Sequence, residues 1–218
     1  MSARDAILAR IRKAHGRPGS EPSESELELV RAQIAQRIRG PQPSITRAAD
    51  PIEQFKRECD RVGTTHSHAQ NREGVPHEVG RYLQANDLEH RVVGWNELAS
   101  LDWAGAGITF EDRLAHGEDR TGITGCFCAI AETGTLLMLS SPAHPKKTAL
   151  LPETHIAVVS TSRMVATMEA AFALLRAERG ELPRATWFVS GASRTADIEM
   201  TLVIGAHGPY RAHVILIP

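Results

Sequence analysis

Cysteine is scarce in this chain of 218 residues: Cys59 stands alone, and one phenylalanine separates Cys126 from Cys128. An iron–sulfur cluster usually takes four thiolates, and a structural zinc ion takes four ligands. Three cysteines supply neither set by themselves, so we expect reduced thiols and neither a metal nor a cofactor bound by this chain. Any redox centre that the protein works with would then belong to a partner.

Strong net charge and long apolar runs are also missing. The 25 basic and 26 acidic side chains leave a net charge of −1, which gives no general attraction to nucleic acid or to an anionic membrane. No apolar run approaches the roughly 20 residues of a membrane-spanning helix, and the first residues lack the apolar core of a secretory signal. We therefore expect a cytoplasmic protein without a membrane span and without a nucleic-acid partner.

What is present is an ordinary globular composition, with 42% hydrophobic and 23% charged residues. Two amphipathic helices are predicted within residues 1–49, because apolar residues recur at spacings of three and four. The apolar positions are Ile7, Leu8 and Ile11, then Leu27, Val30, Ile34 and Ile38. Since these are too few for a core, we predict an amino-terminal helical arm that packs on the main body or on another subunit. A simple decoration of the domain is the open alternative.

Residues 50–218 alternate between strand and helix patterns. Strands are predicted at residues 64–67, 89–94, 106–110, 135–139, 156–160, 186–189, 202–204 and 214–217. Helices are predicted from Asp50, at residues 76–84 and at residues 164–179. Continuous apolar strands that alternate with helices are typical of a mostly parallel sheet covered on both faces. We therefore predict one α/β domain with three layers.

The most distinctive loop, residues 190–199, reads Ser-Gly-Ala-Ser-Arg-Thr-Ala-Asp-Ile-Glu between a strand and a predicted helix start. Its small residues leave backbone N–H groups available to an anion. Ser193 and Thr195 add hydroxyls, Arg194 adds a planar cation, and Asp197 adds an acceptor. Two interpretations stay open: Arg194 clamps an anion, or it pairs with Asp197 and holds the loop. A nucleophilic Ser193 is disfavoured, because the second glycine of a nucleophile elbow is absent.

Threonine and glycine gather again at residues 121–125 and 129–135. Glycine permits a close backbone approach, and threonine hydroxyls can bind phosphate or carboxylate oxygens. We predict ligand contacts from Thr124, Thr133, Gly134 and Thr135. Glu132 is a candidate general base or nucleophile. Plain turns remain the alternative, because neither segment matches a phosphate-binding or dinucleotide-binding fingerprint.

The turn at residues 205–209 adds His207 and Gly208 to the predicted ligand-binding residues. Open α/β sheets bind ligands at the carboxyl ends of their strands, and we expect His207 to lie there. His66 and His68 would share one face of a strand. Without a third ligand in view, a surface strand is favoured over a metal site.

Taken in order, these segments resemble the lactate utilization protein C family, which is built on the LUD domain. The resemblance rests on residues 122–124, 129–135, 151–156, 191–199 and 205–209, and it extends to a short helix at residues 4–11. One departure is Ala192, which stands where a proline is common in this loop.

The resemblance implies a fold similar to the sugar-phosphate isomerase and CoA-transferase group. It also implies a role in the bacterial oxidation of L-lactate to pyruvate, beside two iron–sulfur proteins. We therefore expect an accessory subunit that binds a small anionic ligand in a cleft, while iron–sulfur clusters belong to its partners; a homo-oligomer stays open. The alternative is a stand-alone enzyme acting on a phosphorylated or CoA-linked small molecule, with Glu132 as base or nucleophile.

Overall fold

The computed structural model describes residues 2–17, 21–36, 38, 40–41, 49–196 and 200–218. The chain forms two compact units, residues 1–46 and 47–218, and each is described by itself. The first unit holds α1 (Ala3–Ala14) and α2 (Glu24–Gln36), as the amphipathic pattern predicts. Ser2 and Asp5 form a capping box at the start of α1, which satisfies backbone N–H groups that a helix leaves unpaired.

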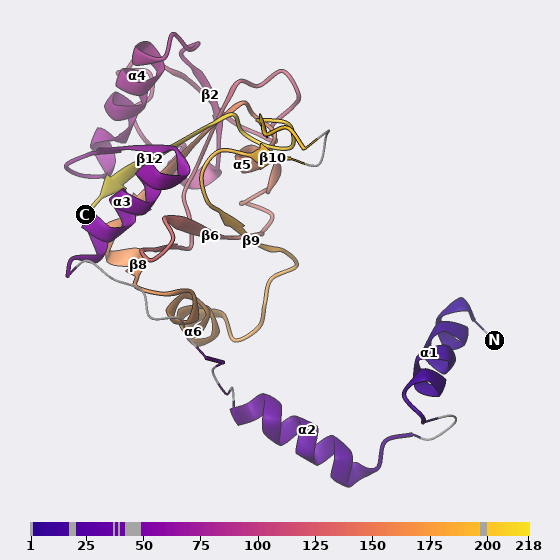
Figure 1. The fold of residues 1–218 in the computed structure, drawn as a ribbon. Helices are drawn as coiled ribbons and strands as arrows, with labels where there is room; N and C mark the ends of the chain where they lie inside the picture. Colours follow the sequence, from indigo (N-terminus) through magenta and orange to yellow (C-terminus); the bar gives the residue numbers. More distant parts are fainter. Residues whose placement is uncertain (1, 18–20, 37, 39, 42–48, 197–199) are drawn as a thin grey trace. The chain divides into compact units, whose positions relative to one another are not determined.

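A six-stranded parallel sheet forms the centre of the second unit, in the order β1-β12-β7-β4-β2-β3 (Figure 1). Its strands are β1 (Thr64–His68), β2 (Arg91–Gly94), β3 (Thr109–Asp112), β4 (Thr121–Thr124), β7 (Thr154–Ser160) and β12 (Arg211–Ile217). Every neighbouring pair is parallel. The predicted α/β class with a mostly parallel sheet is therefore confirmed.

A second, four-stranded sheet follows the order β8-β5-β6-β9. Its strands are β5 (Cys128–Ile130), β6 (Thr135–Leu139), β8 (Met164–Val165) and β9 (Thr186–Val189). We expected β6 and β9 in one parallel sheet, but both lie here, and β6 is antiparallel to each neighbour. The turn between β5 and β6 is too short for a parallel connection, which needs about a dozen residues. A separate hairpin pairs β10 (Arg194–Thr195) with β11 (Val203–Ile204).

Two helices, α4 (Val75–Ala85) and α6 (Met168–Arg179), cover the outer faces of the two sheets, while α3 (Pro51–Val62) and α5 (Lys147–Leu150) contribute to the core between the sheets. The 3-10 turns are η1 (Arg72–Gly74), η2 (Asn96–Leu98) and η3 (Thr161–Arg163). Residues of α4 join a core with the six-stranded sheet, and residues of α6 join another with the second sheet. In the described parts of the chain, no helix is long and apolar enough to cross a membrane.

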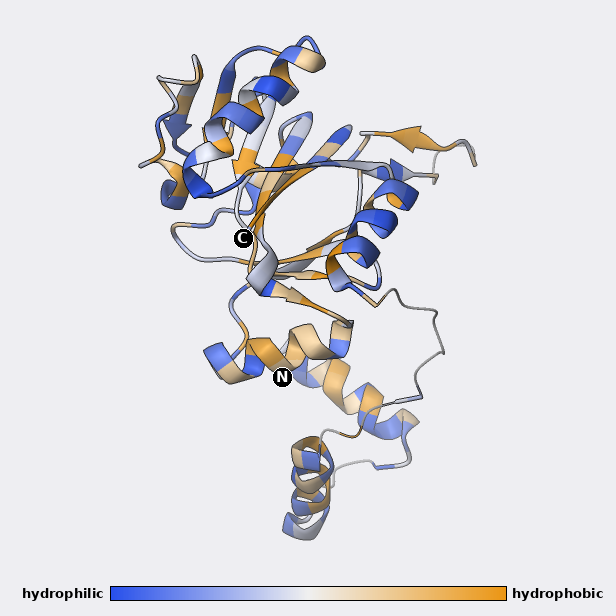
Figure 2. Ribbon diagram, turned by 90° about the vertical axis from the view of Figure 1, so that its left-hand side faces the viewer, coloured by the Kyte–Doolittle hydropathy of each residue, from blue (hydrophilic) through white to orange (hydrophobic). Residues whose placement is uncertain are grey.

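The two sheets face each other across a shared core. This core contains Phe55 and Cys59 of α3, Leu136 and Met138 of β6, and Val159, Val214 and Leu216 of the large sheet. Between these positions, Leu137 points the other way, into the core with α6. Side chains alternate along a strand, so the residues of β6 after Thr135 are all apolar because both faces of the strand are buried. Figure 2 shows the strands of this unit largely orange and its helices banded in blue and orange.

Residues 121–125 correct one prediction, because residues 121–124 form β4 inside the large sheet instead of a loop. β4 pairs with β2 on one side and β7 on the other. Its three residues other than glycine are β-branched, a type that favours strands. A Cβ atom on Gly122 would lie 2.1 Å from the carbonyl oxygen of Thr148, so α5 packs directly on the strand there. This glycine indicates close packing and not a turn.

His213 of β12 is buried on the face of the large sheet that α4 covers. Its Nδ1 lies 2.8 Å from Thr65 Oγ1, and its Nε2 lies 3.1 Å from Ser67 Oγ. The ring stacks on Tyr82 with 4.1 Å between the ring centroids. Burial, together with the nearby His66, lowers the pKa of His213 to about 4. A neutral imidazole with both nitrogens hydrogen-bonded is what a buried histidine requires.

The free energy of unfolding should fall as the pH drops from about 6.5 to about 4. Burial lowers the pKa of both His155 and His213 from the ordinary 6.5 to about 4. The unfolded chain therefore binds more protons between these values, so stability is complete above about pH 6.5 and declines toward pH 4. We expect a loss of roughly 2–3 kcal/mol for each histidine in urea unfolding between pH 7 and pH 4.

The matched comparison is His213→Gln against His77→Gln, because His77 is exposed on α4. The first variant should show a flatter dependence of unfolding free energy on pH, and the second should follow the original protein. Equal pH dependence in all three proteins would contradict the assignment of His213 as a buried neutral group.

Candidate functional site

The predicted turn at residues 133–135 packs against α3. Thr133 Oγ1 donates to Thr135 Oγ1 at 2.8 Å, and the latter lies 2.7 Å from Ser190 Oγ. Gly134 has a φ of +61°, and a Cβ atom there would lie 2.8 Å from the backbone nitrogen of Cys59. The hydroxyls thus bond to one another, and the glycine permits the helix to approach.

The predicted anion clamp also reaches α3. Arg194 and Thr195 form β10 instead of a helix start, and Arg194 Nη2 donates to the carbonyl oxygen of Val62 at 3.2 Å. Val62 is the last residue of α3, where carbonyl groups lack helical partners and a cation is favourable. Asp197 lies outside the described residues, so its pairing with Arg194 stays a prediction.

The turn at residues 205–209 meets the same loop. The backbone nitrogen of Ser193 donates to the carbonyl oxygen of Pro209 at 2.8 Å. A Cβ atom on Gly208 would lie 3.2 Å from Ser193 Cβ. His207 is exposed and precedes β12, so it lies toward the amino end of that strand, where we had expected a carboxyl end. The expectation was wrong because the turn leads into the central sheet and not out of it.

Thr124 and His155 lie between the sheets beside this junction. Thr124 Oγ1 is 2.8 Å from His155 Nε2, both residues are buried, and burial lowers the pKa of the histidine to about 4. The space that His155 lines with Gly134 and Gly191 has a volume of only about 10 Å³. A single water molecule needs about that much. The predicted segments therefore meet, but in this conformation they form a packed junction with no room for a larger ligand.

Glu132 lies at the start of α6. Its Oε1 accepts a hydrogen bond of 2.8 Å from the backbone nitrogen of Met168, the first residue of that helix. Thr167 Oγ1 accepts from Ala170 N at 3.1 Å. A carboxylate at a helix amino terminus satisfies unpaired N–H groups and interacts favourably with the helix dipole. Capping of α6 is a sufficient structural reason for a carboxylate at Glu132, and a catalytic role of Glu132 stays a prediction.

The strand order indicates a different location for a ligand. From β2 the chain runs outward to β3, whereas from β4 it runs through β7 to β12 on the other side. The order therefore reverses between β2 and β4. In open α/β sheets, ligands bind outside the carboxyl ends of the strands at such a reversal. Trp95 follows β2 at this point, and Gly125 and Cys126 follow β4.

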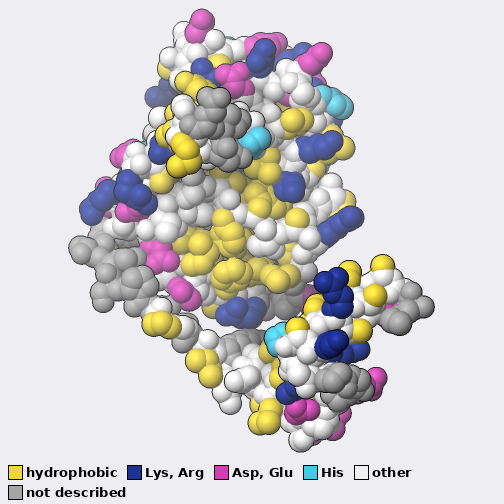
Figure 3. All heavy atoms as spheres, turned by 45° about the vertical axis from the view of Figure 1, so that its right-hand side comes forward, with side chains coloured by type: hydrophobic (Ala, Val, Ile, Leu, Met, Phe, Trp, Pro, Cys, Tyr) yellow, Lys and Arg dark blue, Asp and Glu magenta, His cyan; other side chains and the backbone are white. Residues whose placement is uncertain are grey.

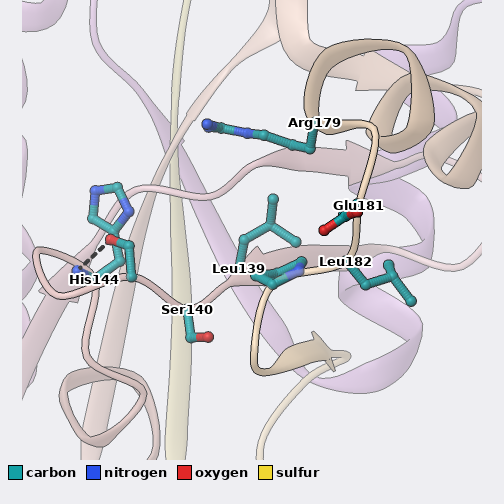
Figure 4. Close-up of a pocket in the computed structure, with 8 residues that line it drawn as sticks. Leu139, Ser140, His144, Arg179, Glu181 and Leu182 are labelled. Atoms are coloured by element: carbon teal, nitrogen blue, oxygen red, sulfur yellow. Dashed lines mark hydrogen bonds between the residues drawn. The ribbon is translucent and has the colours of Figure 1, made fainter.

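Two adjoining pockets lie at this reversal, with volumes of about 170 and 260 Å³. The first is lined by Trp95, Glu97, Cys126, Phe127 and Arg163, and the second by Ser140, Ser141, Glu181, Leu182 and Pro183. Both are lined by Leu139, His144 and Arg179, so they form one crevice, which we call the switch-point crevice. Figure 4 shows the larger pocket.

His144 is held between an aromatic ring and a carboxylate. Its ring centroid lies 4.5 Å from that of Trp95, and its Nε2 lies 3.5 Å from Glu97 Oε2. Its backbone nitrogen donates to Ser141 Oγ at 3.1 Å. Trp95 is fixed in turn, because its Nε1 donates to the carbonyl oxygen of Pro145 at 3.2 Å. An oriented histidine beside a carboxylate can exchange a proton or a hydrogen bond with a ligand.

The two arginines of the crevice differ in their availability. Arg163 binds both carboxylate oxygens of Glu178, at 2.5 and 3.0 Å, and its Nε donates to the carbonyl oxygen of Phe127. The carbonyl oxygen of Arg179, at the end of α6, accepts from Glu181 N at 2.7 Å, but its guanidinium has no hydrogen bond or salt bridge to the described residues; Glu178 lies near enough to interact with it electrostatically. Figure 4 shows the side chain of Arg179 extending across the pocket on the side of His144. Arg179 is therefore the cation that can bind an anion here.

The three thiols are free, and none is activated. Cys59 and Cys128 are buried, and Cys126 is half-buried. Burial raises the pKa of Cys59 to about 12 and that of Cys128 to about 11, so both are protonated at neutral pH. Among the described residues, no three His, Cys, Asp or Glu side chains gather to hold a metal ion.

Comparison with known proteins identifies the family. Residues 52–217 match the family model described as the LUD domain. The chain belongs to the LUD domain family. The six-stranded sheet, the second sheet and both sites described above lie within this LUD domain. The resemblance seen in the sequence motifs is thereby confirmed.

Curated relatives match parts of this chain. Lactate utilization protein C of Bacillus subtilis is 34% identical over 150 residues, covering 63% of this chain and 62% of the relative. The protein of the same name from Shouchella clausii is 42% identical over 98 residues, covering 44% and 43%. An uncharacterized protein of Neisseria meningitidis serogroup B is 40% identical over 88 residues, covering 40% and 38%. The matches thus span between 38% and 62% of these relatives' lengths.

A solved structure shows the same fold. The crystal structure of a DUF162 family protein from Deinococcus radiodurans aligns with a TM-score of 0.57 at 22% identity, covering 80% of this chain and all of that chain. At this level of identity, the likeness concerns the architecture of the LUD domain and not its chemistry.

Sequence reasoning missed the switch-point crevice of the LUD domain. Its polar residues come from separate segments: Glu97 after β2, His144 before α5, and Arg179 at the end of α6. None of them belongs to a compact motif. One usable signal was the position of Trp95 and Glu97 directly after a predicted strand, where α/β sheets carry their ligand residues.

Glu132→Ala should lower the free energy of unfolding of the LUD domain by about 1 kcal/mol, the typical effect of losing a helix cap. Glu132→Gln should cost less, because the amide oxygen can still accept from Met168. Urea denaturation measures both. Glu118→Ala is the control, because Glu118 lies exposed in a loop. Unchanged stability in Glu132→Ala would contradict the capping role.

Proposed function

We propose that this protein is an accessory subunit of a system that oxidises L-lactate to pyruvate. The observation that carries the proposal is the LUD domain match together with relatives named lactate utilization protein C, such as those of Bacillus subtilis and Shouchella clausii. Its contribution would be to bind a small anionic ligand and to present it to the other components.

The switch-point crevice is the place proposed for this ligand. Arg179 offers a planar guanidinium that matches the geometry of a carboxylate. His144, with Glu97 behind it, can bond to a hydroxyl or carbonyl group beside that carboxylate. Each of the two pockets, with volumes of about 170 and 260 Å³, is smaller than the roughly 300–1,000 Å³ of a typical site for a drug-sized ligand. A small 2-hydroxy or 2-oxo monocarboxylate fits this combination.

Charge supports a monoanion over a phosphorylated ligand. Arg163 is already neutralised by Glu178, which leaves Arg179 as the free cation among the described lining residues. Glu97 and Glu181 place two further carboxylates on the lining. A doubly charged phosphate ester would meet these like charges, which disfavours its binding.

Iron–sulfur proteins are the partners proposed for this subunit. Oxidation of lactate to pyruvate releases two electrons, which need a carrier. This chain has three cysteines, one fewer than the four thiolates that an iron–sulfur cluster usually takes. We therefore place the clusters in the partner proteins.

The second hypothesis is a stand-alone enzyme that acts on a phosphorylated or CoA-linked molecule through Glu132. It ranks lower because the Glu132 carboxylate already accepts from Met168 N. A thermal-shift screen with CoA esters and sugar phosphates tests it. Such a ligand at about 100 times its Kd should stabilise the protein by about 2.7 kcal/mol.

Deletion of the gene in its native host should abolish growth on L-lactate and leave growth on pyruvate intact. A plasmid copy of the gene should restore growth on L-lactate. Pull-down of the tagged protein from lactate-grown cells, followed by an iron assay, should recover iron-containing partners. Normal growth of the deletion strain on L-lactate would overturn the proposed role.

Arg179→Ala should weaken the binding of L-lactate or pyruvate by roughly 10- to 100-fold, the range for hydrogen bonds to a charged group. Isothermal titration calorimetry measures this, and Arg176→Ala on the same helix is the matched control. Arg194→Ala distinguishes the two locations: it should leave binding unchanged if the ligand occupies the switch-point crevice. If only Arg194→Ala weakens binding, the ligand site lies at the α3 junction.

A further inference from the structure

The strand β9 leaves one edge of the second sheet open. β6 is its neighbour on one side, and no other strand of the described chain pairs with it. The backbone nitrogen of Ser140 donates to the carbonyl oxygen of Ala185 at 2.9 Å, so the backbone groups of Ala185 face β6. Backbone groups alternate in direction along an antiparallel strand. The N–H and C=O groups of Thr186 and Phe188 therefore point to the open edge.

This edge lacks the features that usually keep a strand from pairing. Protein edges are commonly protected by charges, proline, bulges or covering loops. β9 reads Thr-Trp-Phe-Val, with no charge and no proline. The side chain of Phe188 is 40% exposed, and its ring packs edge-on at 5.8 Å from Phe172 of α6. Figure 3 shows hydrophobic side chains gathered on the side of this unit that carries β9.

We propose that β9 pairs with β9 of a second copy of this chain, antiparallel across a two-fold axis beside Phe188. In this register Phe188 lies opposite Phe188 of the second copy, and Thr186 lies opposite Ser190. Because the groups of these alternate residues face outward on both copies, the two strands can exchange hydrogen bonds pairwise. The two four-stranded sheets would then join into one continuous sheet.

Side-chain chemistry favours a second copy over an unrelated strand. Trp187 lies opposite Val189 of the second copy, and both belong to the inner face in each sheet. β9 itself carries no charged residue, so no like charges meet within the paired strands, whereas opposed like charges would destabilise the pair. The two exposed Phe188 rings cover each other. With a two-fold axis, the same surface of each copy forms the contact.

The size of the surface limits the affinity. A stable interface buries about 1,200–2,000 Å² in total, and a four-residue strand does not reach this by itself. Phe172, which packs against Phe188, extends the apolar contact around it. We therefore expect a dimer that dissociates in the micromolar range. The proposal does not depend on the role in lactate utilization, because self-association is measured without ligand or partner.

Sedimentation velocity of the full chain across micromolar concentrations tests the proposal. The sedimentation coefficient should rise with concentration from monomer to dimer. Phe188→Glu places two carboxylates opposite each other across the axis and should weaken the dimer at least tenfold. Leu114→Glu is the control, because Leu114 is also exposed, at 53%, but lies in the loop between β3 and β4. Matching melting temperatures for the two variants would show that Phe188→Glu is folded.

Crosslinking tests the register. In a hydrogen-bonded antiparallel pair the Cα atoms lie about 5.5 Å apart, within the range of a disulfide. Phe188→Cys should therefore give a reducible covalent dimer under mild oxidation, whereas Leu114→Cys and the unmodified chain should not. A chain that stays monomeric at all concentrations would overturn the proposal. So would a dimer that persists in Phe188→Glu and forms no crosslink through Phe188→Cys.

Discussion

Both faces of β6 must be buried at once, and the arrangement of the domain depends on this constraint. Leu136 and Met138 face the six-stranded sheet, while Leu137 faces α6. The second sheet is therefore held between the large sheet and a helix. The space between the sheets has two ends, and β6 runs from one to the other: Thr135 lies at the α3 junction, and Leu139 lines the switch-point crevice.

These two ends differ because different groups meet at each. At the junction, Gly134 and Gly191 bring loop backbone against α3, and hydroxyls bond to one another, so the space closes to about 10 Å³. At the crevice, the side chains are bulky or charged, and contacts with other residues hold them in place. Trp95 is bound to Pro145, and Arg163 is bound to Glu178. Most of the glycines that identify the family therefore serve packing, and the open space lies elsewhere.

The anion site that we propose in the crevice would depend on geometry more than on net charge. Arg163 is neutralised by Glu178, and His144 lies beside Glu97, which leaves Arg179 as the one described lining cation without a salt bridge. In the proposed site, a single guanidinium opposite an oriented histidine would recognise a carboxylate with a neighbouring oxygen by the geometry of its hydrogen bonds. This is consistent with a chain whose net charge is −1.

The sequence by itself determined most of the local elements, the α/β class and the family, because periodicity, caps and loop motifs depend on neighbouring residues. The helices α4 and α6 and the strands β7 and β12 follow from such patterns. Tertiary structure alone decided which sheet each strand joined, and it showed that Gly122 marks close packing in β4 and not a loop. It also decided that Glu97, His144 and Arg179 line one crevice. These residues lie far apart along the chain, and only the packing of two sheets and a helix brings them together.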